Sequence, residues 1–170
     1  MNTSDLVLYE EEFKKINDIV TRLKIDANAK FVFLVDKNGQ QIASHGDSNL
    51  HIDTTSLASL TAGNVAATDG LAKLLGEKEF SILFHEGERD NLHISVVSNR
   101  VILVVIFDER SSLGLVRLRV KKASTALEEI FNAIVKKTER AREEGSSVES
   151  GFESPFAEIT DEDIDNLFNI

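Results

Sequence analysis

The stretch "KFVFLVDKNGQQIAS", which runs from Lys30 to Ser44, decides the fold class. An apolar run rich in β-branched and aromatic residues precedes Asn38-Gly39, and a second short strand-like segment follows it. Asn-Gly between two such segments is a strong indication of a β-hairpin, because both residues tolerate positive φ. An antiparallel sheet therefore starts here, and the elements on either side of the hairpin determine what covers it.

Two helical patterns flank the hairpin. Before it, apolar residues recur at steps of three and four among charged ones, which predicts an amphipathic helix. These residues are Leu6, Tyr9, Phe13, Ile16, Val20 and Leu23. After it, "DTTSLASLTAGNVAATDGLAKLLG" predicts a long helix that Asp53 opens and that Gly76 ends as a C-cap.

Three further strand patterns and one helical pattern follow. The strands are "FSILFHE", "NLHISVVS" and "VILVVIFD", separated by "GERDN" and by Asn99-Arg100, and the helix begins near Ser112. This order, α-β-β-α-β-β-β-α, predicts an α+β fold with a five-stranded antiparallel sheet. We expect this domain to occupy residues 1–138, followed by a flexible acidic linker at 139–153 and a C-terminal docking helix at 154–170.

The central helix presents two different faces. At about 100° per residue, five apolar residues fall within one arc, which we expect to pack against the sheet: Leu57, Leu60, Ala67, Leu71 and Leu74. The opposite side carries small residues, namely Ala58, Ala62, Ala66 and Gly70, with Gly63 on the flank. Glycine inside a helix costs about 1 kcal/mol relative to alanine, so this second face requires a compensating role. It is a docking surface, for a twin subunit or another protein, or an exposed surface of poor helix-forming sequence without a role, or a surface covered by the chain itself. Asn64, near the leucine arc, is expected to satisfy backbone groups.

Composition and charge exclude several classes of function. The formal net charge of −10 argues against binding to nucleic acid or to anionic membrane surfaces. Residues 139–170 contain ten acids and two arginines, so they carry −8 of that charge and leave −2 for residues 1–138. No apolar run approaches the ~20 residues of a membrane span, and the first residues do not resemble a signal peptide. The sequence contains no cysteine, which fits a reducing cytoplasm. We therefore expect a cytoplasmic protein.

The sequence shows no catalytic or metal-binding pattern. His45, His51, His85 and His93 lack metal-ligand spacing, and "HEGER" lacks the second histidine of a zinc-protease motif. We expect His85 and His93 to be partly buried strand residues. Neither a nucleophile elbow nor a phosphate-binding glycine loop occurs. The basic run "RLRVKK" at 117–122 indicates a solvated helix face or a site for an acidic partner. We expect no catalytic residue, no metal and no cofactor.

The chain ends in an unusual segment, "SPFAEITDEDIDNLFNI" at 154–170, in which apolar residues stand among acids. These apolar residues are Phe156, Ile159, Ile164, Leu167 and Phe168. Thr160 and Asp163 resemble a capping box, after which the last three apolar residues fall on one face of a helix of about two turns. Such a helix is marginal alone in water. We expect it to dock in an apolar groove of a partner; the alternative is that it folds back on its own domain.

Several stretches together resemble the MglB family of bacterial roadblock-domain proteins. The resemblance is carried by "LVLYEEEF", "FVFLVDKNGQ", "LTAGNVAAT", "LVVIFDERSSLGLVRLRVKKA" and "SPFAEITDEDIDNLF", and it covers nearly the whole chain except the linker. It implies a roadblock fold and a homodimer, joined through edge strands, that binds one GTP-loaded MglA, a Ras-like GTPase. It also implies that the dimer accelerates GTP hydrolysis by reshaping the switch region of MglA, without an arginine finger, in the service of cell polarity or motility.

The same resemblance implies partner-binding residues. Ala62, Ala66 and Gly70 match the surface that faces the GTPase, and the C-terminal helix matches one that binds MglA elsewhere and is linked to nucleotide exchange. GTP and Mg²⁺ would then belong to the partner. The protein would be a cytoplasmic regulator, concentrated at a cell pole, and not itself an enzyme. Three alternatives stay open: assistance by a loop arginine, Arg89 or Arg110; a scaffold that only localises a GTPase or motor complex; and a ligand-sensing domain.

Overall fold

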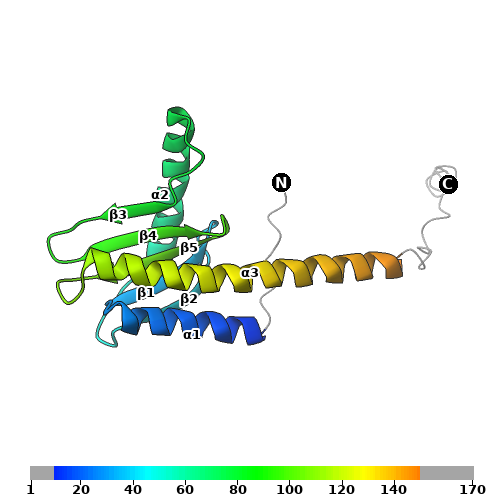
Figure 1. Cartoon of the computed structure of the whole chain (residues 1–170), viewed down its shortest axis with the longest axis horizontal. Helices are drawn as coiled ribbons and strands as arrows, with labels where there is room; N and C mark the ends of the chain where they lie inside the picture. The colour runs from blue at the N-terminus through cyan, green and yellow to red at the C-terminus, as the bar shows by residue number, and fades with distance from the viewer. Residues whose placement is uncertain (1–9, 150–170) are drawn as a thin grey trace, which may run out of the picture. The chain divides into compact units, whose positions relative to one another are not determined.

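The computed structural model describes residues 10–149 (Figure 1). In chain order the elements are α1 (Glu10–Asp26), β1 (Phe31–Asp36), β2 (Gln41–Gly46), α2 (Thr54–Leu75), β3 (Ile82–His85), β4 (Asn91–Val97), β5 (Val101–Phe107) and α3 (Leu113–Glu149). The predicted order α-β-β-α-β-β-β-α and the α+β class are confirmed. The chain divides into two compact units after Ile134. None of the helices in residues 10–149 is long and apolar enough to cross a membrane.

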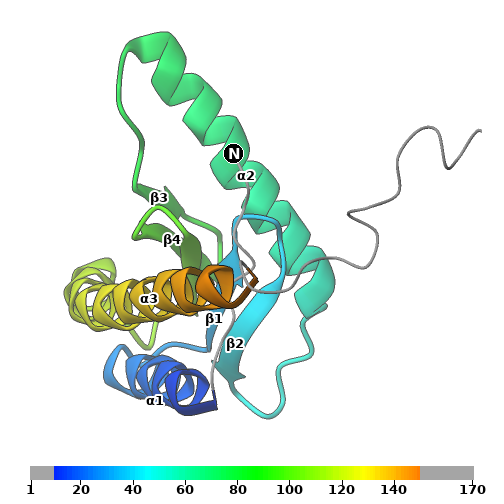
Figure 2. The same ribbon diagram turned by 90° about the vertical axis from the view of Figure 1, so that its right-hand side faces the viewer.

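The five strands form one antiparallel sheet in the order β2-β1-β5-β4-β3. β1 and β5 lie at its centre, paired from Phe31 opposite Ile106 to Asp36 opposite Val101. Helix α1 and the part of α3 up to Ile134 cover one face, and α2 covers the other (Figure 2). Because both faces are covered, the two central strands are continuous apolar runs and do not alternate with polar residues.

Alternate residues of the central strands fill two separate cores. Leu34 points to one face of the sheet, where it packs with Ile16 of α1 and Phe131 of α3. Phe33, its neighbour in sequence, points to the other face and packs in the same core as Val65 of α2. This alternation follows from the two-residue period of a strand. Helix α2 therefore has a core of its own, and the way it sits on that core decides which of its residues are exposed.

The predicted hairpin between β1 and β2 is confirmed, although its turn differs from the expected one. Residues 37–40 connect the strands, and Gly39 alone among them has a positive φ, of 87°. The carboxylate of Asp36 accepts hydrogen bonds from the N–H groups of Asn38 at 2.9 Å and Gln40 at 2.8 Å. Asp side chains often stabilise turns in this way. Asn38 therefore does not need the left-handed conformation that a two-residue Asn-Gly turn would require.

Both predicted ends of α2 are confirmed. Oδ1 of Asp53 accepts a hydrogen bond from the Ser56 N–H at 3.1 Å, which satisfies a free donor of the first turn. Hydrogen bonds from the hydroxyl and then the backbone of Ser56 lower the pKa of the Asp53 carboxyl. At the other end Gly76 adopts a φ of 75°, and its N–H donates to the carbonyl of Lys73 at 3.3 Å. The left-handed residue ends the helix.

Helix α3 begins at Leu113, next to the predicted start near Ser112, and continues to Glu149. Residues 139–149, which we expected to belong to a flexible linker, are thus helical. The rest of that segment and the predicted docking helix at 154–170 lie outside the described residues. The role of the five apolar tail residues therefore stays a prediction, as does the domain division at 138.

Candidate functional site: the exposed faces of helix α2

Helix α2 packs on the sheet through small and β-branched residues. The buried ones are Ala58, Thr61, Val65, Thr68 and Ala72. The prediction that the leucine arc packs against the sheet is therefore wrong: Leu60 is 73% exposed, Leu71 56% and Leu74 84%. Large strand residues such as Phe33 and Ile102 already fill this core. Short side chains on the helix fit above them, and long ones turn outward.

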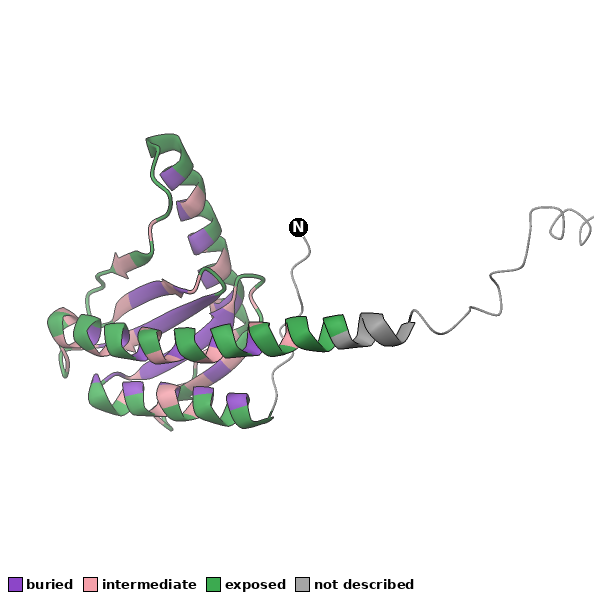
Figure 3. Cartoon of the chain, turned by 45° about the vertical axis from the view of Figure 1, so that its right-hand side comes forward, coloured by how far each residue is buried: buried purple, intermediate pink, exposed green. Residues whose placement is uncertain are grey.

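We define the leucine face of α2 as Leu60, Leu71, Leu74 and Leu75, the last of which is 71% exposed. Of the other residues in the predicted arc, Ala67 is also exposed and Leu57 is half-buried. Figure 3 shows how much of the C-terminal half of α2 is open to solvent. Exposed apolar residues gathered on one surface indicate an interaction site, so this face is a candidate for contact with another chain.

A side-chain contact connects α2 with β3, an edge strand of the sheet. The Nδ2 atom of Asn64 lies 3.2 Å from Nε2 of His85, the last residue of β3. We expected Asn64 to satisfy backbone groups, but its side-chain amide contacts this imidazole instead. Ile82, at the other end of β3, is 50% exposed. The contact holds the leucine side of α2 against the strand whose outer edge is unpaired in this sheet.

The small-residue face consists of Ala62, Ala66 and Gly70. Ala66 and Gly70 are exposed and Ala62 is half-buried, whereas Ala58, which we expected on the same face, is buried against the sheet. A Cβ atom placed on Gly63 or on Gly70 would have no neighbouring atom within 4 Å. Nothing in residues 10–149 therefore requires glycine at these two positions, and the surface can be approached closely from outside.

The turn between β1 and β2 borders this small-residue face. A Cβ atom on Gly39 would lie 3.4 Å from the Cα atom of Ser59. Ser59 precedes Ala66 by seven residues, which places the two on nearly the same side of the helix at about 100° per residue. Lys37, in the same turn, donates a hydrogen bond to Oδ1 of Asn99. The turn therefore supports α2 where the small-residue face begins.

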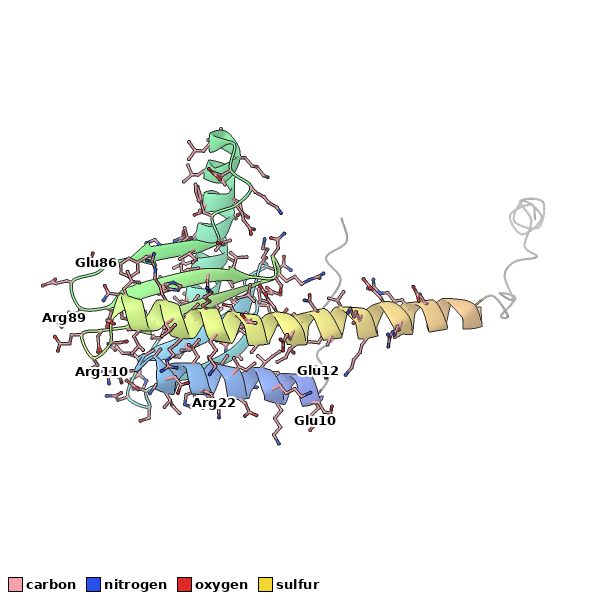
Figure 4. The ribbon with its side chains drawn as sticks, in the orientation of Figure 1. Glu10, Glu12, Arg22, Glu86, Arg89 and Arg110 are labelled. Carbon is pink, nitrogen blue, oxygen red and sulfur yellow. The ribbon has the colours of Figure 1, made fainter. Side chains whose placement is uncertain are left out.

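The two loop arginines considered in the sequence lie in different surroundings, as labelled in Figure 4. Arg110 contacts Asp108, with Nε 3.0 Å from Oδ1, and Asp47, with Nη2 3.1 Å from Oδ2. Asp47 also pairs with Lys24 at 2.6 Å. Hydrogen bonds from Lys24 and then Arg110 lower the pKa of Asp47. Arg89 is exposed in the loop between β3 and β4. Arg110 is therefore already held by two carboxylates.

The histidines divide between surface and interior. His93 of β4 is 1% exposed, so it is fully buried, whereas His85 is exposed; the expectation of partial burial is wrong for both. In the part of the chain that the structure describes, no three His, Asp or Glu side chains gather closely enough to hold a metal ion. The expected lack of a cofactor stays a prediction.

Residues 15–107 match the Roadblock/LC7 domain family. A solved structure of Myxococcus xanthus MglB is 66% identical to this chain and superposes with a TM-score of 0.71, over 76% of this chain and 96% of that one. This chain belongs to the MglB family. An MglB structure from Thermus thermophilus, described as a gliding protein, is 35% identical with a TM-score of 0.71, over 76% and 97% of the two chains.

A third MglB structure, described as having a tetrameric arrangement, is 33% identical with a TM-score of 0.72, over 76% of this chain and 97% of that one. Among proteins with curated descriptions, no match was found. Membership of the MglB family confirms the roadblock fold expected from the motifs.

What the sequence reasoning missed is the exposure of the leucine face. Its signal was present, because α2 as a whole has only two charged residues, Asp69 and Lys73, and yet eleven apolar ones, too many for a single buried stripe.

Proposed function

We propose that this MglB-family protein is a homodimeric activator of a Ras-like GTPase of the MglA type. It binds the GTP-loaded partner through the small-residue face of α2 and accelerates hydrolysis. The exposure of Ala66 and Gly70, with free space around Gly70, is the observation that carries the proposal. In this role the protein is a regulator, and GTP and Mg²⁺ are bound by the partner.

Small side chains allow the switch region of the GTPase to approach the helix backbone closely. We propose that this contact reshapes the switch region, so that the GTPase aligns its own catalytic groups and no arginine finger is inserted. The ion pairs of Arg110 with Asp47 and Asp108 support this mechanism, because a finger must be free to reach the transition state. Releasing Arg110 would leave both carboxylates without a cation that they now contact.

The homodimer would form through the leucine face of α2 and the edge strand β3. The exposure of four leucines and of Ile82 supports this arrangement, since apolar residues are enriched in the centres of homodimer interfaces. The outer edge of β3 offers backbone groups for pairing with a second copy. The two exposed faces of α2 would then have different roles, the leucine face toward the twin subunit and the small-residue face toward the GTPase.

We further propose that the C-terminal segment 154–170 binds the same GTPase at a second site and takes part in nucleotide exchange. Its apolar residues, spaced for one face of a short helix, support this role. A tethered second contact raises the local concentration of the segment near a partner already bound by the roadblock domain. The proposed location is the cytoplasm, concentrated at a cell pole, in a process of polarity or motility.

Single-turnover GTP hydrolysis by the cognate GTPase tests the activating role. We expect acceleration that saturates near two chains per GTPase. The double substitution Ala66→Arg with Gly70→Arg should reduce stimulation about tenfold or more, because long cationic side chains keep the surfaces apart; tenfold corresponds to about 1.4 kcal/mol. Ala133→Arg, the same change at an exposed position of α3, is the matched control.

The dimer should survive the double substitution, because neither residue is part of the leucine face; sedimentation checks this. Full stimulation by the double variant would show that the small-residue face is not the GTPase site. Binding without any acceleration by the unmodified protein would instead identify a scaffold that localises a GTPase.

The role of the tail is tested by replacing Ile164, Leu167 and Phe168 with serine, which keeps its charges. We expect weaker binding to the GTPase and a larger loss in nucleotide exchange than in hydrolysis, because the apolar side of the helix is removed. Deletion of residues 154–170 should have the same effect. Unchanged affinity and exchange would rule out a docking role for this segment.

A further inference from the structure

One buried polar cluster is not used by the proposed function. His93 lies on β4, flanked by Phe84 of β3 and Val105 of β5 in the sheet register. These residues face the core that α1 and α3 share. Neither nitrogen of the His93 ring has a hydrogen-bond partner among the described residues. Ser95, two residues further on the same face of β4, is also buried, and its Oγ atom has no partner there either.

The missing hydrogen bonds of His93 and Ser95 within residues 10–149 are unfavourable for folding, so the presence of these two residues requires an explanation. A buried polar group without a hydrogen bond destabilises a fold, and phenylalanine or leucine would avoid that loss at position 93. The imidazole is also the side chain whose charge changes most readily near neutral pH. Protonation of the imidazole therefore offers a reason for histidine at position 93.

The charged groups around His93 oppose its protonation. Burial lowers the pKa of His93 below the ordinary value of 6.5, and the positive charge of Arg117 on α3 lowers it further. The flanking residues on the neighbouring strands, Phe84 and Val105, are uncharged, and so are Val116 and Val120, which α3 contributes to this core. An imidazolium here would be a buried cation beside another cation, with water as its best available partner.

We propose that His93 makes the packing of the first turns of α3, residues 113–123, against β4 sensitive to pH. While the imidazole is neutral, these turns stay closed over the sheet. Once it is protonated, they open so that water reaches His93 and Ser95. The sign follows from linkage: because the folded state binds this proton less readily than the open state, closure is fully stable above pH 6.5 and weakens as the pH falls below it.

The opening stays local because α3 is anchored on both sides of this segment. Further along the helix, Leu127, Phe131 and Ile134 are fully buried in the core. Before it, the hydroxyl of Ser111 donates a hydrogen bond to the carbonyl of Ala27, at the end of α1. Folded domains can open locally in one segment at a free energy below that of global unfolding.

Hydrogen exchange measured on the full chain by mass spectrometry at pH 7.5 and 5.5, with intrinsic rates corrected for pH, tests the proposal. We expect exchange in residues 113–123 to be about threefold faster or more at pH 5.5, with no change in β1. His93→Phe, which cannot be protonated, should remove the pH difference. His45→Phe, the same change at an exposed position of β2, should keep it.

A uniform change across the domain, or a pH difference that survives in His93→Phe, would overturn the proposal. Should His93→Phe fail to fold, an NMR titration of the His93 ring in the unmodified chain replaces it. The ring must then titrate in the same pH range in which exchange of α3 accelerates. Titration of the ring without any change in α3, or no titration above pH 5, would equally overturn it.

Discussion

Gly46, the last residue of β2, lies opposite Phe31 in the pairing of β1 with β2. A Cβ atom at Gly46 would lie only 2.2 Å from Cδ2 of the Phe31 ring, which is buried and stacked on Phe33 with centroids 6.1 Å apart. We expect Gly46→Ala to lower the free energy of unfolding by about 1–3 kcal/mol, the usual effect of overpacking. Urea denaturation of the purified protein measures this.

Two variants accompany that measurement. Gly114→Ala is the control, because a Cβ atom at Gly114 would have no neighbour within 4 Å; it should not destabilise the protein. Phe31→Leu introduced into the Gly46→Ala variant should recover part of the lost stability, since the smaller side chain makes room. If Gly46→Ala were as stable as the parent, the Phe31 ring would have to move aside at little cost.

Single residues differ in how well the sequence reveals their role. Asp53 and Gly76 could be predicted as helix caps, because a cap depends on residues a few positions away in the same helix. The need for glycine at position 46 could not, because the side chain that excludes a methyl group belongs to another strand. Asn64 was misassigned for a similar reason, since its partner His85 is also distant in sequence.

Helix α2 offers a pair of glycines with opposite expected responses. Gly76 has a φ of 75°, where a Cβ atom is strained, so Gly76→Ala should destabilise the protein by about 1 kcal/mol. Gly70 is helical and has open space around it, so Gly70→Ala should stabilise the single chain by up to about 1 kcal/mol through higher helix propensity. Thermal unfolding of each variant, at equal protein concentration, measures the two shifts.

The expected result is that the two substitutions shift the unfolding temperature in opposite directions. Equal destabilisation by both variants would mean that Gly70 is in contact with something in the purified protein, such as a second copy of the chain. If neither variant changed the unfolding temperature, the C-terminal turn of α2 would contribute little to stability. Either result would change the description of which surface of α2 is free.

At the level of elements, the sequence predicted the position of α2 but not its orientation. Apolar and small residues surround much of this helix, so its periodicity has no single dominant direction. Periodicity reports that residues avoid water, without telling whether the sheet beneath or another chain covers them. Ala58 and Val65 pack against the sheet because the side chains of the strands are large, and the leucines at 60, 71, 74 and 75 are left outside.

The whole molecule is expected to be a dimer held by the leucine face. Replacing Leu71 and Leu74 with glutamate should produce monomers of 18.8 kDa in sedimentation experiments, because like charges would meet across the interface. Leu118→Glu is the matched control, since Leu118 is 62% exposed but lies on α3. Persistence of the dimer in the double variant would place the interface elsewhere.

The fold of the whole domain could be predicted because strand order and helix boundaries depend on local patterns and caps. The length of α3 could not: its polar and acidic residues beyond position 138 resemble a linker, yet they continue the helix to Glu149. Charge alone does not distinguish a solvated helix from a flexible segment, because both are rich in Glu and Arg.

The open space around Gly63 and Gly70 has a consequence for the evolution of this protein. Within residues 10–149 both positions would accept alanine and gain helix propensity, so mutation supplies a steady drift away from glycine that a contact from outside these residues would oppose. A duplicated gene copy released from its partner should therefore lose these two glycines early, before its core changes. A lineage that retains them is one in which the opposing protein is still present.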